Sequence, residues 1–300
     1  MNLQMNWQYF SRRIALLIAL CMSISFSNSY AQTQTDQTEP SPVAQRIISL
    51  APHITEMLYS AGAGSKIVGV VNYSDYPADA LNKPVIGSYN AINLEQIIQL
   101  NPDLILGWKS GNRIKDLQRL KELGFNVFVF EIAYLDDIPN RIEALGKMAG
   151  SQDIAKQSAN KLRETLKQVR ADNLHKPKIT SFYEIWHKPL ITMNPKQFIS
   201  QAMAVCGAEN IYSDLKQLTA EISVESLFER DPQLFLLGGE QSFQKDWLKS
   251  WQNYPNLKAV KNKQIYLLNN SHYQRPTARL INALEPLCKK VDQARQHYQK

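Results

Sequence analysis

The sequence of 300 residues lacks the short motifs of the common enzyme families. It contains no nucleophile elbow, no glycine-rich phosphate loop and no paired-histidine motif of the zinc proteases. Its five histidines are scattered and do not have the spacing of metal ligands. We therefore predict that the protein is not an enzyme, and that it has no catalytic residues, no resident cofactor and no metal site.

The chain also has no hydrophobic run long enough to cross a bilayer. The apolar run at 14–22 is too short, and Arg12 and Arg13 precede it. Ser29-Tyr30-Ala31 fits the small-residue pattern of a cleavage site. We predict a secretory signal over 1–31 and a flexible polar leader over 32–45. A short membrane anchor, or a lipoprotein attached at Cys21, is the alternative.

Cysteine is rare, with three in the whole chain. Cys21 would leave with the signal, so the mature chain keeps Cys206 and Cys288. In an oxidising compartment this pair favours a disulfide that closes a loop of roughly 80 residues, worth about 4 kcal/mol in the chain-entropy model. Two separate buried thiols are the alternative.

Positive charge is in mild excess but is not concentrated anywhere. The formal net charge of +7 becomes +5 (7 − 2) when Arg12 and Arg13 are removed with the signal. The basic residues do not alternate with aromatic ones in any run. We expect no nucleic-acid partner.

One pattern occurs twice. Residues 92–108 (INLEQIIQLNPDLILGW) and 222–238 (ISVESLFERDPQLFLLG) align without a gap, and Glu95 coincides with Glu225. Each copy has an N-cap residue (Asn93 or Ser223), a glutamate in the first helical turn and two apolar residues predicted to face a core. A proline then ends the helix, and a short apolar run predicts a strand buried on both faces. We infer two related α/β lobes, although a chance recurrence of a common unit is the alternative.

Helical and strand patterns alternate on both sides of a long polar helix. We predict an α/β fold of two Rossmann-like lobes with mostly parallel sheets, joined by a single long backbone helix. The predicted boundaries are 46–150 for the N-terminal lobe, 151–175 for the linking helix and 176–300 for the C-terminal lobe. The apolar face of the linking helix is narrow and includes Ile154. One closing helix is predicted over 277–298.

Loops after the predicted strands are rich in aromatic, amide and hydroxyl groups. Ligands bind beyond the carboxyl ends of strands in such sheets, and between lobes in two-lobed proteins. The composition suits a large, flat ligand with a polar rim, although ordinary polar surface loops are the alternative. His53 and His272 also follow predicted strands, and hydrogen bonding or packing is favoured over metal ligation for both.

Glu95 and Glu225 have two interpretations. They could stabilise the starts of their helices. They could also form a pair of negative anchors, one on each lobe, for arginines of a two-fold symmetric partner.

From Arg46 to Val291 the chain resembles the periplasmic cobalamin-binding proteins of ABC importers, in the helical-backbone class of substrate-binding proteins. The resemblance rests on these motifs: Ser49-Leu50-Ala51-Pro52 with Thr55-Glu56, Val68-Gly69-Val70, Tyr73-Ser74-Asp75-Tyr76-Pro77, Asn93-Leu94-Glu95, Pro102-Asp103-Leu104, Cys206-Gly207 with Glu209-Asn210-Ile211, Glu225, and Arg275 before Arg279.

The resemblance implies that the protein captures a corrinoid in the periplasm and delivers it to an inner-membrane permease dimer. It implies that Glu95 and Glu225 dock onto permease arginines, and that Cys206 and Cys288 form the family disulfide. The residues expected to contact the ligand are Tyr73, Tyr89, Trp108, Ser271, His272, Tyr273, Gln274 and Arg275.

The chain departs from the family pattern at five positions. Tyr89, Thr219 and His272 stand where tryptophans are expected, and Ser271 and Gln274 replace acidic residues. The ligand could therefore be cobalamin, a related cobamide or precursor, or a different chelate. A ferric-siderophore or haem receptor on the same scaffold, and a secreted enzyme acting on a tetrapyrrole, are the alternatives.

Overall fold

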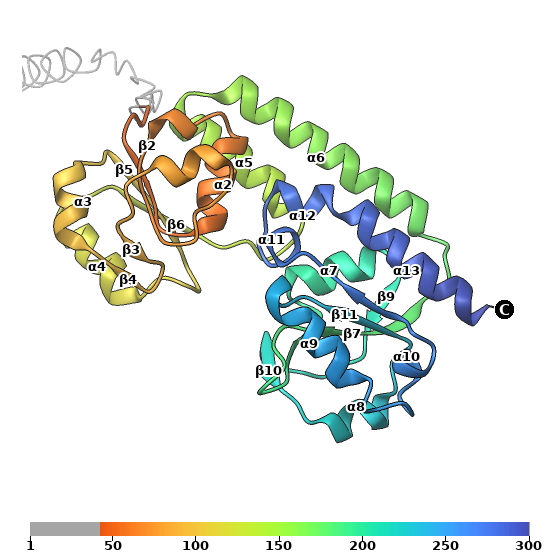
Figure 1. The fold of residues 1–300 in the computed structure, drawn as a ribbon. Coiled ribbons are helices and arrows are strands. Elements are labelled where there is room, and N and C mark those ends of the chain that lie inside the picture. Colours follow the sequence, from red (N-terminus) through yellow and green to blue (C-terminus); the bar gives the residue numbers. More distant parts are fainter. Residues whose placement is uncertain (1–42, 300) are drawn as a thin grey trace, which may run out of the picture. The chain divides into compact units, whose positions relative to one another are not determined.

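The computed structural model describes residues 43–299, so the predicted signal and nearly all of the leader lie outside the described residues. The first half of the chain forms β1 (Ile47–Ser49), α2 (Pro52–Ser60), η1 (Gly64–Lys66), β2 (Ile67–Val70), η2 (Ala78–Asn82), β3 (Gly87–Ser88), β4 (Ala91–Ile92), α3 (Leu94–Leu100), β5 (Leu104–Trp108), α4 (Ile114–Glu122), β6 (Val127–Phe130) and α5 (Asp137–Ala149) (Figure 1).

The long helix α6 (Gln152–Asn173) follows. The second half forms β7 (Ile179–Glu184), β8 (Ile191–Met193), α7 (Phe198–Val205), β9 (Ala208–Asn210), β10 (Thr219–Glu221), α8 (Val224–Arg230), β11 (Leu234–Leu237), α9 (Gln241–Trp251), α10 (Lys258–Lys261), β12 (Ile265–Leu267), α11 (Asn270–Tyr273), α12 (Ala278–Asn282) and α13 (Leu284–Tyr298).

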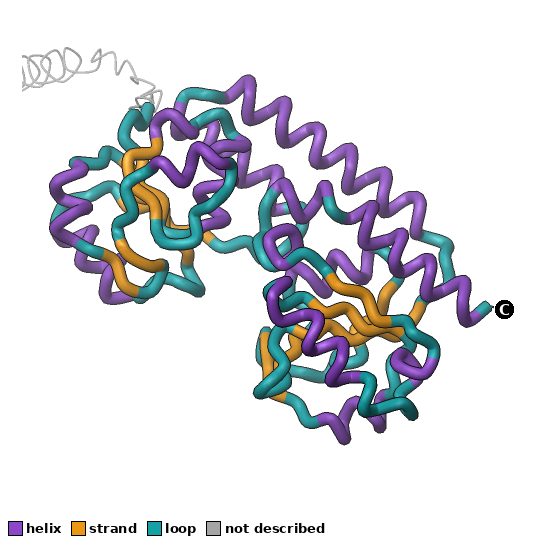
Figure 2. Tube along the Cα trace, viewed as in Figure 1, coloured by secondary structure: helices purple, strands orange, loops and turns teal. Residues whose placement is uncertain are grey.

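Two four-stranded sheets have the same topology. The first has the order β2-β1-β5-β6 and the second the order β9-β7-β11-β12, and every pairing in both is parallel. Counted along the chain, each order is 2-1-3-4. Figure 2 shows the strands in two sets with helices around each. The predicted α/β class with two parallel sheets is confirmed. The antiparallel pairs β3-β4 and β8-β10 were not predicted.

The repeated segments fold alike. The Asn93 side chain accepts a hydrogen bond from the Gln96 amide, and the Ser223 side chain accepts one from the Ser226 amide. These bonds satisfy amides that the helix itself leaves free. The residue before each proline is left-handed, with φ 43° at position 101 and 36° at position 231. A left-handed residue ends a helix. Each helix therefore stops before its proline, as predicted from the sequence.

The helix burial pattern corrects one prediction. Of the two apolar residues expected to face the core, Ile97 and Leu227 are fully buried. Their neighbours Ile98 and Phe228 are 51% and 41% exposed. A helix of seven residues has about two turns and places only one row of side chains against the sheet. The second apolar residue therefore faces solvent in both copies.

The strands β5 and β11 are buried on both faces, as predicted. Their alternate residues enter different cores, because successive side chains of a strand point to opposite faces. Leu104 and Leu236 belong to one large hydrophobic core cluster that includes residues of both sheets, while Ile105 and Phe235 belong to separate smaller clusters. The two halves of the chain thus share one continuous core.

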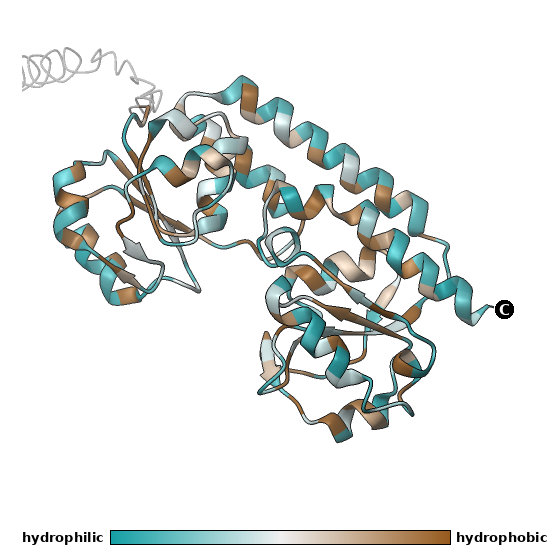
Figure 3. Cartoon of the chain, viewed as in Figure 1, coloured by the Kyte–Doolittle hydropathy of each residue, from teal (hydrophilic) through white to brown (hydrophobic). Residues whose placement is uncertain are grey.

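Helix α6 connects the two halves and packs against both. It contacts α2 and α5 from the first half, and α7, α12 and α13 from the second. Figure 3 shows that most residues of this helix are hydrophilic, with a few hydrophobic ones between them. Its buried row includes Ala155, Leu162, Leu166 and Val169. Ile154, which was predicted on the apolar face, is 55% exposed, so that assignment was wrong.

The closing segment is two helices rather than the single helix predicted. α12 ends and α13 begins at Ala283. Pro286 lies in the first turn of α13, where its missing amide costs nothing, but a continuous helix would place its ring against the carbonyl of residue 282. Cys288 of α13 forms the predicted disulfide with Cys206, which caps α7. Within residues 43–299, no helix is long and apolar enough to span a membrane.

Candidate ligand-binding site and docking surface

The segment 269–275 is fixed by its own polar groups. The Asn269 side chain caps α11 by accepting from the Ser271 amide at 3.0 Å. Gln274 Nε2 donates to the Gly238 carbonyl at 2.5 Å, at the end of β11. Tyr273 is buried, and its hydroxyl donates to the Ala283 carbonyl at 2.9 Å. Of the residues predicted here, Tyr273 anchors the segment in the core, whereas Ser271, His272 and Arg275 are partly exposed.

Arg275 joins the two halves of the chain through carboxylates. Its Nη1 donates to Glu56 Oε1 at 2.9 Å and to Asp75 Oδ1 at 2.6 Å. Arg279 also binds Glu56, with Nε 2.9 Å from Oε2, and its guanidinium lies over the Tyr76 ring. Burial raises the pKa of Asp75, but the hydrogen bond and charge of Arg275 outweigh it and hold the pKa below its ordinary value. Glu56, 3% exposed, is thus the carboxylate shared by two arginines.

His53 lies next to this cluster and next to the predicted aromatic residues. Its ring is 5.0 Å from that of Trp108 in an edge-on arrangement, and the Tyr89 ring is 5.8 Å from Trp108. Burial and the positive charge of Arg275 lower the pKa of His53 to about 3. His53 is therefore a neutral packing residue, which agrees with the role favoured from the sequence. Trp108 packs against His53, Tyr89 lies beside Trp108, and Arg275 is close enough for its charge to act on the imidazole.

Asn112, which lies just before α4, connects the segments that carry Tyr89 and Trp108. Its Nδ2 donates to the Leu50 carbonyl at 2.9 Å and to the Tyr89 carbonyl at 2.6 Å. Its Oδ1 accepts from the Trp108 amide at 2.6 Å. One buried amide thus connects three loops that are distant in sequence. Helix α4 begins two residues after Asn112, at Ile114.

Tyr73 is held in a strained and exposed position. Its φ of 66° is left-handed, a conformation that costs an L-residue about 1–2 kcal/mol. Its side chain is 75% exposed. The next residue, Ser74, is buried and accepts from the Thr55 hydroxyl at 3.1 Å, which fixes the loop. Residues in strained backbone conformations are concentrated at ligand-binding and other functional sites.

The two docking candidates occupy equivalent places. Glu95 and Glu225 are each the second residue of a capped helix, and both are exposed. Neither takes part in a salt bridge within residues 43–299. Hydrogen bonds from its own backbone amide and from the Ser223 hydroxyl lower the pKa of Glu225. That carboxylate therefore stays ionised and available to a cation.

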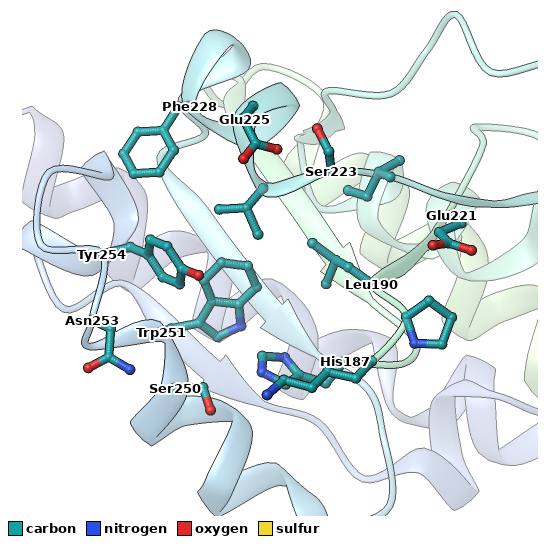
Figure 4. Close-up of a pocket in the computed structure, with 14 residues that line it drawn as sticks. His187, Leu190, Glu221, Ser223, Glu225, Phe228, Ser250, Trp251, Asn253 and Tyr254 are labelled. Carbon is teal, nitrogen blue, oxygen red and sulfur yellow. The ribbon is translucent and has the colours of Figure 1, made fainter.

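A pocket of about 690 Å³ lies beside Glu225. Figure 4 shows Phe228, Glu225 and Ser223 along one edge, His187 and Ser250 along the opposite edge, and Trp251 between them. The Trp251 Nε1 donates to Glu184 at 2.6 Å, so the indole presents no free donor to the pocket. Burial raises the pKa of Glu184, and its other oxygen is 2.6 Å from His187 Nδ1.

A family model for periplasmic binding proteins matches residues 47–271. The chain belongs to the periplasmic binding protein family. Membership confirms the predicted compartment and the prediction that the protein binds a solute rather than catalysing a reaction. The predicted signal peptide itself lies outside the described residues.

Several curated proteins named vitamin B12-binding protein are similar to this chain. That of Vibrio cholerae serotype O1 is 35% identical over 245 residues, which cover 82% of this chain and 88% of the relative. That of Vibrio campbellii is 33% identical over 253 residues, covering 84% and 91%.

Solved structures agree with this placement in the family. The periplasmic vitamin B12 binding protein BtuF of Vibrio cholerae superposes with a TM-score of 0.77 at 34% identity, covering 84% of this chain and 98% of that chain. The periplasmic heme-binding protein RhuT of Roseiflexus has a TM-score of 0.74 at 19% identity, covering 84% of this chain and 99% of that chain. The second likeness shows the shared fold alone.

Three residues that organise the site had not been singled out from the sequence. Glu56 and Asp75 lie in motifs that carried the resemblance, but their partner Arg275 is about 200 residues away. Asn112 had the form of an ordinary helix start. The residues next to Asn112 in the sequence do not indicate that its side chain binds carbonyl groups distant along the chain. In the part of the chain that the structure describes, no group of metal-ligating side chains is found.

Proposed function

We propose that this protein captures cobalamin or a related corrinoid in the periplasm and delivers it to an ABC permease. The observation that carries the proposal is the 35% identity to the Vibrio cholerae vitamin B12-binding protein over 82% of this chain and 88% of the relative. The grouping of Tyr89, Trp108 and Arg275 around His53 supports it, because two aromatic rings and a cation suit a flat ligand with polar amide arms.

In this proposal the two parallel sheets are the cores of lobes 46–150 and 176–300, and α6 within 151–175 links them. A signal over 1–31 directs export, and 32–45 is the leader. The ligand contacts Tyr73, Tyr89, Trp108, Ser271, His272, Gln274 and Arg275. Tyr273 anchors the last segment from beneath, because its ring is buried and its hydroxyl is bound to Ala283.

A titration of the purified protein tests the ligand class. Cyanocobalamin, cobinamide (which lacks the nucleotide loop) and haem are each added under the same conditions, and binding is followed by calorimetry and visible spectra. We expect saturable one-to-one binding of at least one corrinoid. Saturable binding of haem with no binding of either corrinoid would establish the haem alternative and overturn the proposal. Chemical conversion of the ligand would indicate the enzyme alternative.

The proposal also assigns Glu95 and Glu225 to docking on arginines of a two-fold symmetric permease in the inner membrane. Both are exposed, lie at equivalent places in a repeated unit, and have no salt bridge in the described chain. Release would follow when the permease separates the two lobes. We expect the double variant Glu95→Arg/Glu225→Arg to abolish transport and to leave ligand affinity unchanged.

The matched control is Glu164→Arg, which reverses one exposed charge on α6. It should retain transport, because that face of the protein is not assigned to docking. Loss of ligand affinity in the double variant, or transport that survives it, would contradict the assignment of the two glutamates.

A further inference from the structure

Each docking glutamate has an exposed apolar neighbour on the same helix. Ile98 follows Glu95 by three residues, and Phe228 follows Glu225 by three residues. They are 51% and 41% exposed, although the buried row of each helix is filled by Ile97 and Leu227. The core therefore does not require a large apolar side chain at either place, and both copies of the repeat have one.

The spacing places the charged and the apolar group on one helix surface. Residues three apart on a helix are neighbours, with about 5–6 Å between their Cβ atoms. Glu95 with Ile98, and Glu225 with Phe228, thus form two small surfaces of the same composition. We call them the two acid–apolar pairs. A helix-stabilising role explains the glutamates alone and gives no reason for exposed apolar partners.

The acid–apolar pair of the second half continues into the pocket beside it. The Phe228 ring packs edge-on against Tyr254 at 6.0 Å, and Trp251 lies between the two edges of the pocket (Figure 4). Two carboxylates, Glu221 and Glu225, stand on its rim with one base, Lys188. A volume of about 690 Å³ is large enough for several side chains of a partner.

The carboxylates beside the pocket favour a positively charged partner. The chain as a whole is basic, with a formal net charge of +7. The exposed, unpaired carboxylates at the two equivalent places therefore have the opposite charge to the chain as a whole. Opposite charge at the rim guides a basic partner, and desolvated apolar contacts at the centre provide most of the affinity in protein interfaces. A neutral peptide would use the aromatic floor but leave both carboxylates without a counter-charge.

We propose that each lobe docks through an acid–apolar pair, and that the pocket at Phe228, Tyr254 and Trp251 receives an apolar side chain next to a basic residue of the permease. This inference rests on the proposed function, and it adds an apolar anchor to each charged contact. The pair at Glu95 and Ile98 makes the corresponding contact on the other permease subunit.

The test compares two double variants of the full-length mature protein. Ile98→Ala/Phe228→Ala removes both apolar anchors and keeps both charges. Ile154→Ala/Phe243→Ala is the matched control, because those residues are 55% and 44% exposed and lie on other helices. Affinity for the purified permease in lipid nanodiscs is measured by surface plasmon resonance at two salt concentrations. Ligand affinity is measured in parallel.

We expect the anchor variant to bind the permease about tenfold or more weakly, while the control variant is unchanged. Ligand affinity should not change in the anchor variant. The salt dependence of docking should also stay as in the parent protein, because both carboxylates remain. Glu95→Arg/Glu225→Arg, measured in the same assay, should weaken docking and alter its salt dependence.

The outcomes separate the inference from the proposed function. If charge reversal weakens docking but the anchor variant binds like the control, the apolar anchors are refuted and the docking glutamates stand. If neither the charge-reversal variant nor the anchor variant weakens docking, the assignment of this face to docking is wrong. If the Ile98→Ala/Phe228→Ala variant has lower ligand affinity but docks like the parent protein, the apolar residues serve ligand binding, and the inference is overturned.

Discussion

Protonation of His53 should control the stability of the protein in mild acid. The imidazole is 5% exposed, its ring packs against Trp108, and no hydrogen bond to it is found among residues 43–299. Burial and the charge of Arg275 lower the pKa of His53 from 6.5 to about 3. The start of α2 adds a further positive potential, because His53 lies in the first helical turn.

The direction of the change in stability depends on which state, folded or unfolded, binds a proton at His53. Between pH 6.5 and about 3 the unfolded chain holds a proton on His53 and the folded protein does not. Acidification therefore favours the unfolded state, and stability falls as the pH falls through this interval. One group that differs in protonation changes the free energy of unfolding by about 1.4 kcal/mol per pH unit. Over the whole interval the loss approaches about 5 kcal/mol, a large part of the roughly 5–15 kcal/mol of a typical protein.

Urea unfolding followed by far-ultraviolet circular dichroism at pH 7, 6, 5 and 4 measures this loss. The comparison is with His53→Leu, which cannot take a proton and suits an apolar site. Other groups titrate in both proteins, so the difference between the two profiles isolates His53. We expect the parent to lose about 1.4 kcal/mol per pH unit more than the variant below pH 6. Parallel profiles would show that His53 is protonated in the folded protein, and would refute the reasoning.

Three further predictions concern stability and binding. Replacing Cys206 and Cys288 by serine should lower the free energy of unfolding by about 4 kcal/mol, since the bond spans 82 residues; urea unfolding with and without reductant checks this, and a loss near zero would contradict it. Glu56→Ala leaves two arginines without their shared carboxylate and should cost about 3–5 kcal/mol in thermal and urea unfolding, whereas an unchanged midpoint would show that water replaces it. Tyr73→Gly should relieve the left-handed strain and raise stability by about 1 kcal/mol while weakening ligand affinity; stronger binding would show that the ring is not a contact.

The repeated segments were predictable because their signals are local. A cap residue, a first-turn glutamate, a proline and an apolar run act within about seventeen positions, and each acts through backbone geometry or burial of the nearest residues. The prolines predict where each helix ends, but they do not predict the left-handed conformation of Asn101 and Asp231. The parallel pairing in both sheets follows from the α/β alternation. The sequence did not predict the strand order 2-1-3-4 or the two short antiparallel pairs, which have only two or three residues per strand.

The features that were not predicted depend on contacts between residues distant in the sequence, which no local pattern indicates. Arg275 and Glu56 are 219 residues apart, and their pairing requires the folded arrangement of α2 and the segment after α11. The exposure of Ile98 and Phe228 depends on how short α3 and α8 are relative to the sheet they cover. A pattern of two adjacent apolar residues fits one buried row or two equally well. The break at Ala283 was visible in principle, because Pro286 has a definite effect on the preceding turn.

The core cluster that includes both sheets has a consequence for the folding of isolated fragments and for thermal unfolding. A chain of residues 46–150 or 176–300 alone would lack α6, so the side chains that this helix covers on α2 and α5, or on α7, α12 and α13, would be exposed to water. Neither fragment should be soluble by itself, and heating should melt the molecule in a single step.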